Sequence, residues 1–279
     1  MGYSEFMKTE IKIENISKSF NTQQVLDHIT MDFQRGYIHL LNGNNGCGKS
    51  TLLKIMYGLM IPDEGTVYWN AKDIEKSRNE YLNHIGIVTA DDRSLYHKLS
   101  AYENLYYIGR IQNIPKKELD KHIVSLLDRL HLKNDKTLVE NFSTGMKKKV
   151  MVARAFLNNP DIIFADEVMN GLDKDTCMIV EDMLQEHVQN GNTVFLVSHT
   201  GIHNTNHVKN YLIEKGKKEE SERIARCVLG RVAELSCQKY SSNVIEKIIC
   251  CAGDEIRGEI VKEIASYTKL QDLLHDKVF

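Results

Sequence analysis

The sequence predicts an α/β fold over the first three-quarters of the chain and a short all-α segment after it. Three observations support this prediction. A strand-like run, a glycine-rich turn and a helical run follow one another between residues 37 and 56. The apolar run at residues 162–165 is typical of a parallel strand covered on both faces. Beyond residue 222 the apolar residues recur at helical spacing.

Length and composition limit the classes of protein that the chain can belong to. Its 279 residues can hold one large domain, or one of about 200 residues with an appendage. The formal net charge of −2 gives no general electrostatic reason to bind nucleic acid. No apolar run approaches the roughly 18 residues of a membrane span, and the polar first ten residues lack a signal-peptide core. Six cysteines in a chain this long do not make a disulfide framework, so we expect a reducing, cytoplasmic setting.

The glycine-rich turn fits the pattern G-x-x-x-x-G-K-[ST], in the strand–turn–helix context that a phosphate-binding loop needs. Glycines let backbone N–H groups surround a phosphate chain, and the helix N-terminus adds partial positive charge. Lys49 can reach the β- and γ-phosphates, and the Ser50 hydroxyl can ligate Mg²⁺. Cys47 would have to remain a free thiol. The predicted nucleotide-binding residues are Gly43, Asn44, Asn45, Gly46, Cys47, Gly48, Lys49, Ser50 and Thr51.

Polar residues follow two later apolar strands. The run at 162–165 ends in Asp166 and Glu167, and the run at 193–198 ends at His199. The carboxyl ends of such strands face the crevice where doubly wound folds bind ligands. Asp166 can therefore hold Mg²⁺, directly or through water, and Glu167 is placed to orient or deprotonate a water. His199 becomes a candidate contact to the γ-phosphate.

The middle of the chain is predicted to be helical from residue 101 to about 132, and again over the basic stretch 147–155. A lysine run on a helix is usually a solvated face. Here the helix starts with Ser143-Thr144-Gly145, which is an anion-binding arrangement. Phe20 stands alone in a polar turn predicted at residues 17–21, where an aromatic side chain more often packs than binds a ligand.

With these elements in order, residues from about 9 to 217 resemble an ATP-binding cassette ATPase, the nucleotide-binding subunit of a transporter. The residues that support this resemblance are the phosphate loop, a variant signature motif at 142–146, the Asp166–Glu167 pair, the loop at 171–173 and His199. The resemblance implies a P-loop NTPase fold over residues 1–217, with a mixed sheet core and a helical subdomain at about 93–158.

The resemblance also implies roles for individual residues. Phe20 would stack on adenine, and Ser143, Thr144 and Gly145 would contact the γ-phosphate. Asp173 would lie in the loop where two subunits meet, and catalysis would fall to Glu167, His199 and Lys49. The sequence departs from the family after residue 88, where the usual Mg²⁺-ligating Gln is replaced by Ala90-Asp91-Asp92. Asp91, or its neighbour Asp92, could ligate Mg²⁺ through a water.

The implied cofactors are ATP and Mg²⁺. The implied partners are a second copy of the ATPase domain, arranged head to tail, and a separate transmembrane permease subunit. The variant motifs are similar to those of bacterial exporter ATPases, so we expect a peripheral location on the inner face of the membrane.

Residues 218–279 resemble a different family. The stretch 240–247 is similar to the base-reading helix of a Pumilio-type RNA-binding repeat, in which Ser242 and Glu246 would contact a guanine and Asn243 would stack between bases. Residues 264–279 look like a second repeat that stops before its reading helix. At least about three repeats are needed for a stable array. We therefore expect a helical appendage without independent RNA binding.

Three other interpretations remain open at this stage. The chain could be an RNA-recognition fragment in which the cassette is incidental. It could be a soluble cassette protein that works on nucleic acid or ribosomes, although the sequence has one cassette and no long coiled-coil insertion. It could also be an artificial or joined chain in which only ATP binding survives.

Overall fold

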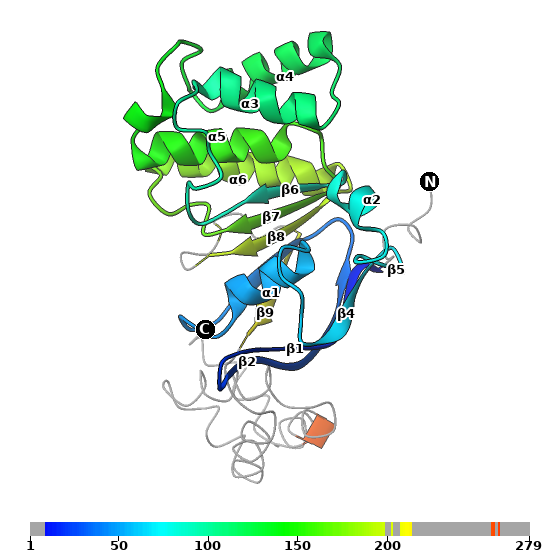
Figure 1. Ribbon diagram of the computed structural model, residues 1–279. Coiled ribbons are helices and arrows are strands. Elements are labelled where there is room, and N and C mark those ends of the chain that lie inside the picture. Colours follow the sequence, from blue (N-terminus) through cyan, green and yellow to red (C-terminus); the bar gives the residue numbers. More distant parts are fainter. Residues whose placement is uncertain (1–8, 199–201, 203–206, 214–257, 260–261, 263–279) are drawn as a thin grey trace. The chain divides into compact units, whose positions relative to one another are not determined.

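The computed structural model describes residues 9–198, 202, 207–213, 258–259 and 262. By its internal contacts the chain divides into two units, Met1–Ile213 and Glu214–Phe279. Nearly all of the described residues belong to the first unit. Figure 1 shows that unit as layers of helix and sheet. No helix in the described part of the chain combines the length and the apolar character that a membrane crossing requires.

A parallel five-stranded sheet forms the centre, in the order β6-β7-β8-β3-β9. Every residue of β7 and of β8 is buried, which agrees with the prediction of strands covered on both faces. The sheet and its helices confirm the predicted α/β class. The strands are β3 (Ile38–Asn42), β6 (Ile85–Val88), β7 (Ile162–Asp166), β8 (Thr193–Val197) and β9 (Val208–Leu212).

A second sheet is antiparallel, in the order β2-β1-β4-β5. The turn predicted at residues 17–21 is wrong, because β1 continues to Phe20 and the chain turns at Asn21, whose φ is 54°. Register shifts between Ile13 and Lys18, where residues of β1 are left unpaired with β2, allow the strand to continue through its polar residues. The strands are β1 (Thr9–Phe20), β2 (Gln23–Gln34), β4 (Glu64–Trp69) and β5 (Lys72–Asp73).

Helices cover both faces of the parallel sheet, and α1 (Lys49–Met56) lies between the two sheets (Figure 1). The apolar residues of β7 alternate between two cores: Ile163 and Ala165 pack with the helices of the helical layer, Ile162 and Phe164 with α1 and the antiparallel sheet. The helical layer consists of α3 (Ala101–Ile111), α4 (Lys116–Arg129), α5 (Thr144–Phe156) and α6 (Lys174–Gln189). The shorter elements are α2 (Arg78–Leu82) and the 3₁₀ helix η1 (Val139–Asn141).

The helical stretch predicted from residue 101 to 132 is two helices, separated at Pro115. Proline removes a backbone donor and fits the start of a helix, so α4 begins directly after it. Helix α5 packs closely on β6, because a Cβ at Gly86 would lie 2.1 Å from the carbonyl oxygen of Ala155. This close contact fixes the position of α5 against the edge of the sheet.

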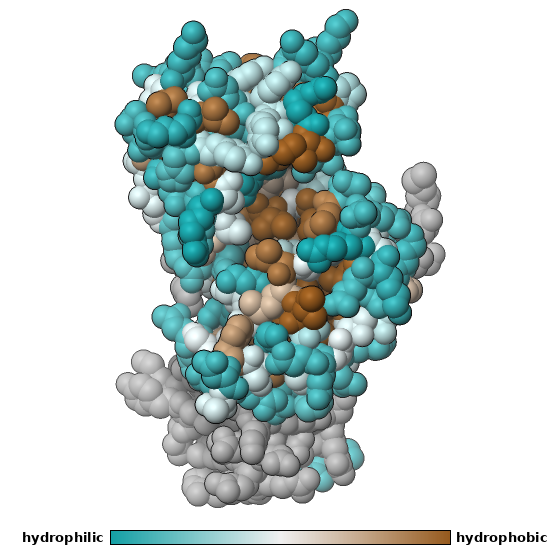
Figure 2. Space-filling view, viewed as in Figure 1, coloured by the Kyte–Doolittle hydropathy of each residue, from teal (hydrophilic) through white to brown (hydrophobic). Residues whose placement is uncertain are grey.

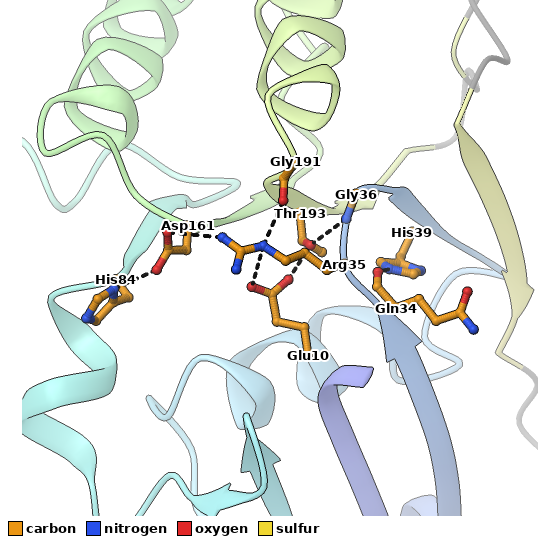
Figure 3. Close-up of polar contacts among 9 residues, drawn as sticks. All are labelled: Glu10, Gln34, Arg35, Gly36, His39, His84, Asp161, Gly191 and Thr193. Atoms are coloured by element: carbon orange, nitrogen blue, oxygen red, sulfur yellow. Dashed lines mark hydrogen bonds and ion pairs between the residues drawn. The ribbon is translucent and has the colours of Figure 1, made fainter. Parts of the chain in front are cut away.

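A cluster of polar groups lies at the amino ends of the parallel strands, away from the phosphate loop (Figure 3). Glu10 of β1 is only 2% exposed and accepts a hydrogen bond from the Thr193 hydroxyl. Arg35 lies 3.9 Å from Glu10 and donates to the carbonyl of Gly191. Burial raises the pKa of Glu10 to about 7, although the hydrogen bond from Thr193 and the charge of Arg35 oppose the shift.

Glu10 is expected to make stability depend on pH. Its folded-state pKa of about 7 exceeds the ordinary 4.5, so the folded protein holds this proton more tightly. Stability from this group is therefore complete below pH ~4.5 and is lost as the pH rises towards 7, by roughly 3 kcal/mol in all. In Glu10→Gln this loss should be absent. Urea unfolding should therefore show the unfolding free energy of the variant rising, relative to that of the wild type, by roughly 3 kcal/mol as the pH increases from ~4.5 towards 7.

The comparison between the two proteins cancels the opposite contribution of His39. Burial lowers the pKa of His39 to about 4, so its contribution increases with pH over the same range in both proteins. Curves of unfolding free energy against pH that run parallel for wild type and Glu10→Gln would refute the assignment.

Candidate functional site

The predicted phosphate loop connects β3 to α1 and depends on two glycines. Gly43 has φ 147°, and a Cβ there would lie 2.1 Å from the carbonyl oxygen of Ile213. Gly48 has φ 104° and is the residue before the first turn of α1. Other residues rarely adopt these backbone conformations, so the glycines set the shape of the loop. Asn44, Asn45 and Gly46 form its exposed part.

Lys49 is held inside this loop. Its side chain is 6% exposed, and its Nζ donates to the carbonyl oxygens of Gly43 at 2.7 Å and Asn44 at 2.9 Å. The ammonium is thus already positioned where the loop would surround a phosphate chain. Cys47 is a free thiol, as expected, but its side chain is 2% exposed and packs in the apolar core. Cys47 can therefore contribute its backbone, and not its thiol, to a ligand.

Ser50 and Asp166 meet at the carboxyl end of β7. Asp166 is 7% exposed, and burial raises its pKa while a hydrogen bond from Ser50 lowers it. Its Oδ1 is buried and makes no hydrogen bond in the structure. A buried, unpartnered carboxylate oxygen beside a hydroxyl is a donor set that suits Mg²⁺, which usually takes one or two carboxylates together with phosphate oxygens. Among the described residues no group of three or more His, Cys, Asp or Glu forms a metal cluster.

Glu167 follows β7 in a left-handed conformation, with φ 50°. Its backbone N–H donates to the carbonyl of Val197 on β8, and its Oε2 accepts from the amide of Asn170 at 2.8 Å. These contacts fix the carboxylate next to Asp166. Six residues after Glu167, Asp173 caps α6 and accepts from the backbone N–H and the hydroxyl of Thr176. These hydrogen bonds lower the pKa of Asp173.

The segment Ser143-Thr144-Gly145 forms the start of α5. Ser143 is the N-cap, and its Oγ accepts from the backbone N–H of Met146 at 3.2 Å. Ser143 and Thr144 are exposed. A Cβ at Gly145 would lie 3.0 Å from the carbonyl oxygen of Gly171. The structure therefore places this segment against the loop that contains Asp173, although the two are far apart in the sequence.

The loop after β6 has carboxylates where the sequence departs from the family pattern. Asp91 accepts from the backbone N–H of Arg93 at 3.1 Å and from its guanidinium at 2.7 Å. Asp92 pairs with Lys147 at 2.8 Å. These hydrogen bonds lower the pKa of both carboxylates. A metal contact from Asp91 would have to share the carboxylate with Arg93, and its ligation of Mg²⁺ stays a prediction.

One buried residue near the site, Lys148, is not predicted by the sequence pattern. A lysine run on a helix is usually a solvated face, but Lys148 is 5% exposed and its Nζ donates to the carbonyls of Thr89 and Ala90. The helical spacing contained the signal, because Met151, Val152 and Ala155 share the buried face of α5 with Lys148. The charge of the lysine hid this periodicity.

The remaining predicted residues differ in how far the structure describes them. Phe20 ends β1, is 43% exposed and lies 6.0 Å from the Lys18 ammonium. Thr51 is half-buried on α1. The predicted residues that lie outside the described part of the chain are His199, Ser242, Asn243 and Glu246.

Comparison with known proteins relates the two parts of the chain to two different families. Residues 26–170 match the model of the ABC transporter family, and residues 231–265 match that of the Pumilio-family RNA binding repeat. The lantibiotic transport ATP-binding protein SrtF of Streptococcus pyogenes is 32% identical over 68% of this chain and 80% of its own length. The bacitracin transport ATP-binding protein BcrA of Bacillus licheniformis is 31% identical over 69% of this chain and 62% of its own length.

Solved structures agree with the sequence comparisons. An ATP-binding subunit of an ABC transporter superposes with a TM-score of 0.68 at 25% identity, over 77% of this chain and 93% of that one. A nucleotide-free ATP-binding cassette gives 0.61 at 26% identity, over 75% and 89%. By sequence, fold and the geometry of its phosphate loop, the chain belongs to the ABC transporter family, as one of its ATP-binding ATPase subunits.

Proposed function

We propose that this chain hydrolyses Mg-ATP as one half of a head-to-tail pair and thereby drives a separate membrane subunit of an exporter. The observation that supports this most directly is the Ser50–Asp166 contact beside the phosphate loop, with a buried carboxylate oxygen left without a hydrogen bond. The nucleotide would supply the partners that this corner of the site lacks.

ATP would bind along the phosphate loop. Residues 44–46 are exposed, and their backbone N–H groups together with the N-terminus of α1 would favour an anion. The Lys49 ammonium would exchange its two carbonyl contacts for phosphate oxygens. Ser50 and Asp166 would hold Mg²⁺, with Asp91 as a further candidate through a water. The metal, when bound, offsets negative charge on the β- and γ-phosphates. Phe20 would stack on the adenine.

Glu167 would align the attacking water, because its carboxylate is oriented by Asn170 next to the Asp166 corner. Catalysis of this kind consists of positioning and charge stabilisation. Lys49 and His199 would offset charge that develops on the γ-phosphate. The signature segment, Ser143-Thr144-Gly145, of a second subunit would offset the same charge from the opposite side of the nucleotide.

The start of α5 suits that second role. Ser143 and Thr144 are exposed, and the helix N-terminus presents N–H groups that favour an anion. The loop at 170–173 packs against this segment and also holds Glu167 through Asn170. A partner subunit that binds at the signature segment would therefore contact the same loop that positions the catalytic carboxylate.

A membrane partner is proposed from the relatives and from the surface. The similar proteins SrtF and BcrA are named as lantibiotic and bacitracin transport ATP-binding proteins. Figure 2 shows apolar side chains gathered on the face between the helical layer and the antiparallel sheet. Leu59, Ile61 and Leu82 are large apolar residues that are exposed, by 66%, 68% and 37%. Exposed apolar patches are typical of interaction sites, and a permease at the inner face of the membrane would cover such a patch.

Lys49→Ala should weaken ATP binding at least ~100-fold, because charge-assisted hydrogen bonds to the phosphates would be lost. Titration calorimetry with Mg-ATP measures this directly. Lys117→Ala, a change on the exposed start of α4, serves as the control and should bind normally. Unchanged affinity in Lys49→Ala would show that the loop does not hold the nucleotide in this way.

Glu167→Gln should bind ATP but stall hydrolysis, so Mg-ATP should convert the variant from monomer to dimer. Light scattering on a sizing column measures the mass with and without nucleotide. A second change, Thr144→Arg, should abolish the shift, because it places a bulky charge on the exposed start of α5. A Glu167→Gln protein that binds Mg-ATP and remains monomeric would be incompatible with the paired mechanism.

RNA recognition is the second candidate function, supported by the Pumilio-repeat match at residues 231–265. We expect no base-specific binding, because one reading helix contacts one base and stable arrays need about three repeats. Filter binding of a guanine-containing RNA to wild type and Glu246→Gln tests this. A clear loss of binding in the variant would demonstrate base reading and revive the alternative.

A further inference from the structure

Lys148 occupies an unusual position for a lysine. It lies on α5, three residues after Gly145 of the segment Ser143-Thr144-Gly145, and only 5% of the residue is exposed. Lysine is almost never fully buried unless its ammonium is paired. The residue belongs to none of the motifs that define the site, so its burial needs an explanation of its own.

Two carbonyl groups hold the ammonium. Nζ donates to the backbone oxygen of Thr89 at 3.1 Å and of Ala90 at 3.0 Å. The preceding residue, Lys147, pairs with Asp92 at 2.8 Å. Two consecutive lysines on α5 therefore bind the loop at residues 89–92, one through its backbone carbonyls and the other through an ion pair. Hydrogen bonds from an ionised donor are roughly twice as strong as neutral ones, so Lys148 fixes this backbone more firmly than an amide could.

The same loop lies next to the catalytic carboxylates. Strands β6 and β7 are parallel neighbours, with Val88 beside Ala165, so residues 89–90 and residues 166–167 leave the sheet at the same edge. Burial lowers the pKa of Lys148, and the charges of Asp166 and Glu167 are the largest of those that oppose the shift. Lys148 in turn counters the rise in the pKa of Asp166.

We propose that Lys148 is a positioning residue for ATP hydrolysis: through the carbonyls of Thr89 and Ala90, its ammonium fixes the loop at 89–92 at the sheet edge where Asp166 and Glu167 lie. The inference rests on the proposed function and adds to it a residue outside the motifs. It also explains how the site can work where Ala90-Asp91-Asp92 replaces a glutamine, since the charge that organises this loop comes from the start of α5.

Lys148→Gln tests the charge, because the amide keeps a donor for the carbonyls and removes the ammonium. Steady-state hydrolysis, ATP affinity by calorimetry and thermal unfolding should be measured together. Misplacement of a catalytic group by about 1 Å can cost ~100-fold. We expect kcat to fall by roughly 10- to 100-fold while the dissociation constant for ATP changes less than about threefold. Lys148→Arg, which retains charge and donors, should restore kcat to within about fivefold of wild type.

Lys117→Gln on α4 is the matched control, the same chemical change at an exposed helix position, and should match wild type. The inference is overturned if Lys148→Gln hydrolyses ATP within threefold of wild type. It is also overturned if this variant fails to fold, or loses ATP affinity in proportion to kcat, because the role is then structural. Wild type and Lys117→Gln that bind ATP without any turnover would instead refute the proposed function itself.

Discussion

The burial of both faces of β7 is the constraint on which the rest of the structure depends. Ile163 and Ala165 face the helical layer, and Ile162 and Phe164 face α1 and the antiparallel sheet. A strand that is apolar on both sides can carry polar groups only where it ends. Asp166 and Glu167 therefore lie at the carboxyl edge of the sheet. The loop at 89–92 follows the adjacent strand β6 at this edge, and the phosphate loop follows β3, which lies on the far side of β8. The site is a consequence of how the core is covered.

The polar groups at the two ends of β7 form two distinct clusters for the same reason. Asp161 precedes the strand and bonds to His84 and Arg35, in the cluster that surrounds Glu10 (Figure 3). Asp166 ends the strand beside Ser50. The apolar residues between them contain no titratable group. The charges that act on the pKa of Glu10 are those of Arg35 and Asp161, which belong to its own cluster.

Sequence patterns could predict the parts of this protein that rest on local rules. The strand at 162–166 and the glycine turn before α1 have unambiguous apolar and steric signatures, and both are where we expected them. The predicted turn at 17–21 failed because β-bulges, which depend on the partner strand, let β1 continue to Phe20. Lys148 and Glu10 escaped prediction because a charged residue at a buried position is understood only when its partners are known. The contact of Gly145 with Gly171 likewise depends on tertiary packing.

The close contact between Gly86 and Ala155 has a mechanical meaning. Ala155 lies near the far end of α5, and no side chain separates its carbonyl from the backbone of β6, so a rotation of the helix would have to pivot about this point. Ser143 lies twelve residues away, which is a lever arm of about 18 Å at the usual helical rise. A rotation of about 5° at the pivot would move Ser143 by ~1.5 Å, about half the length of a hydrogen bond. If α5 rotated as a rigid body, a small change at the sheet edge would therefore displace the exposed Ser143 by a distance that matters for a hydrogen bond.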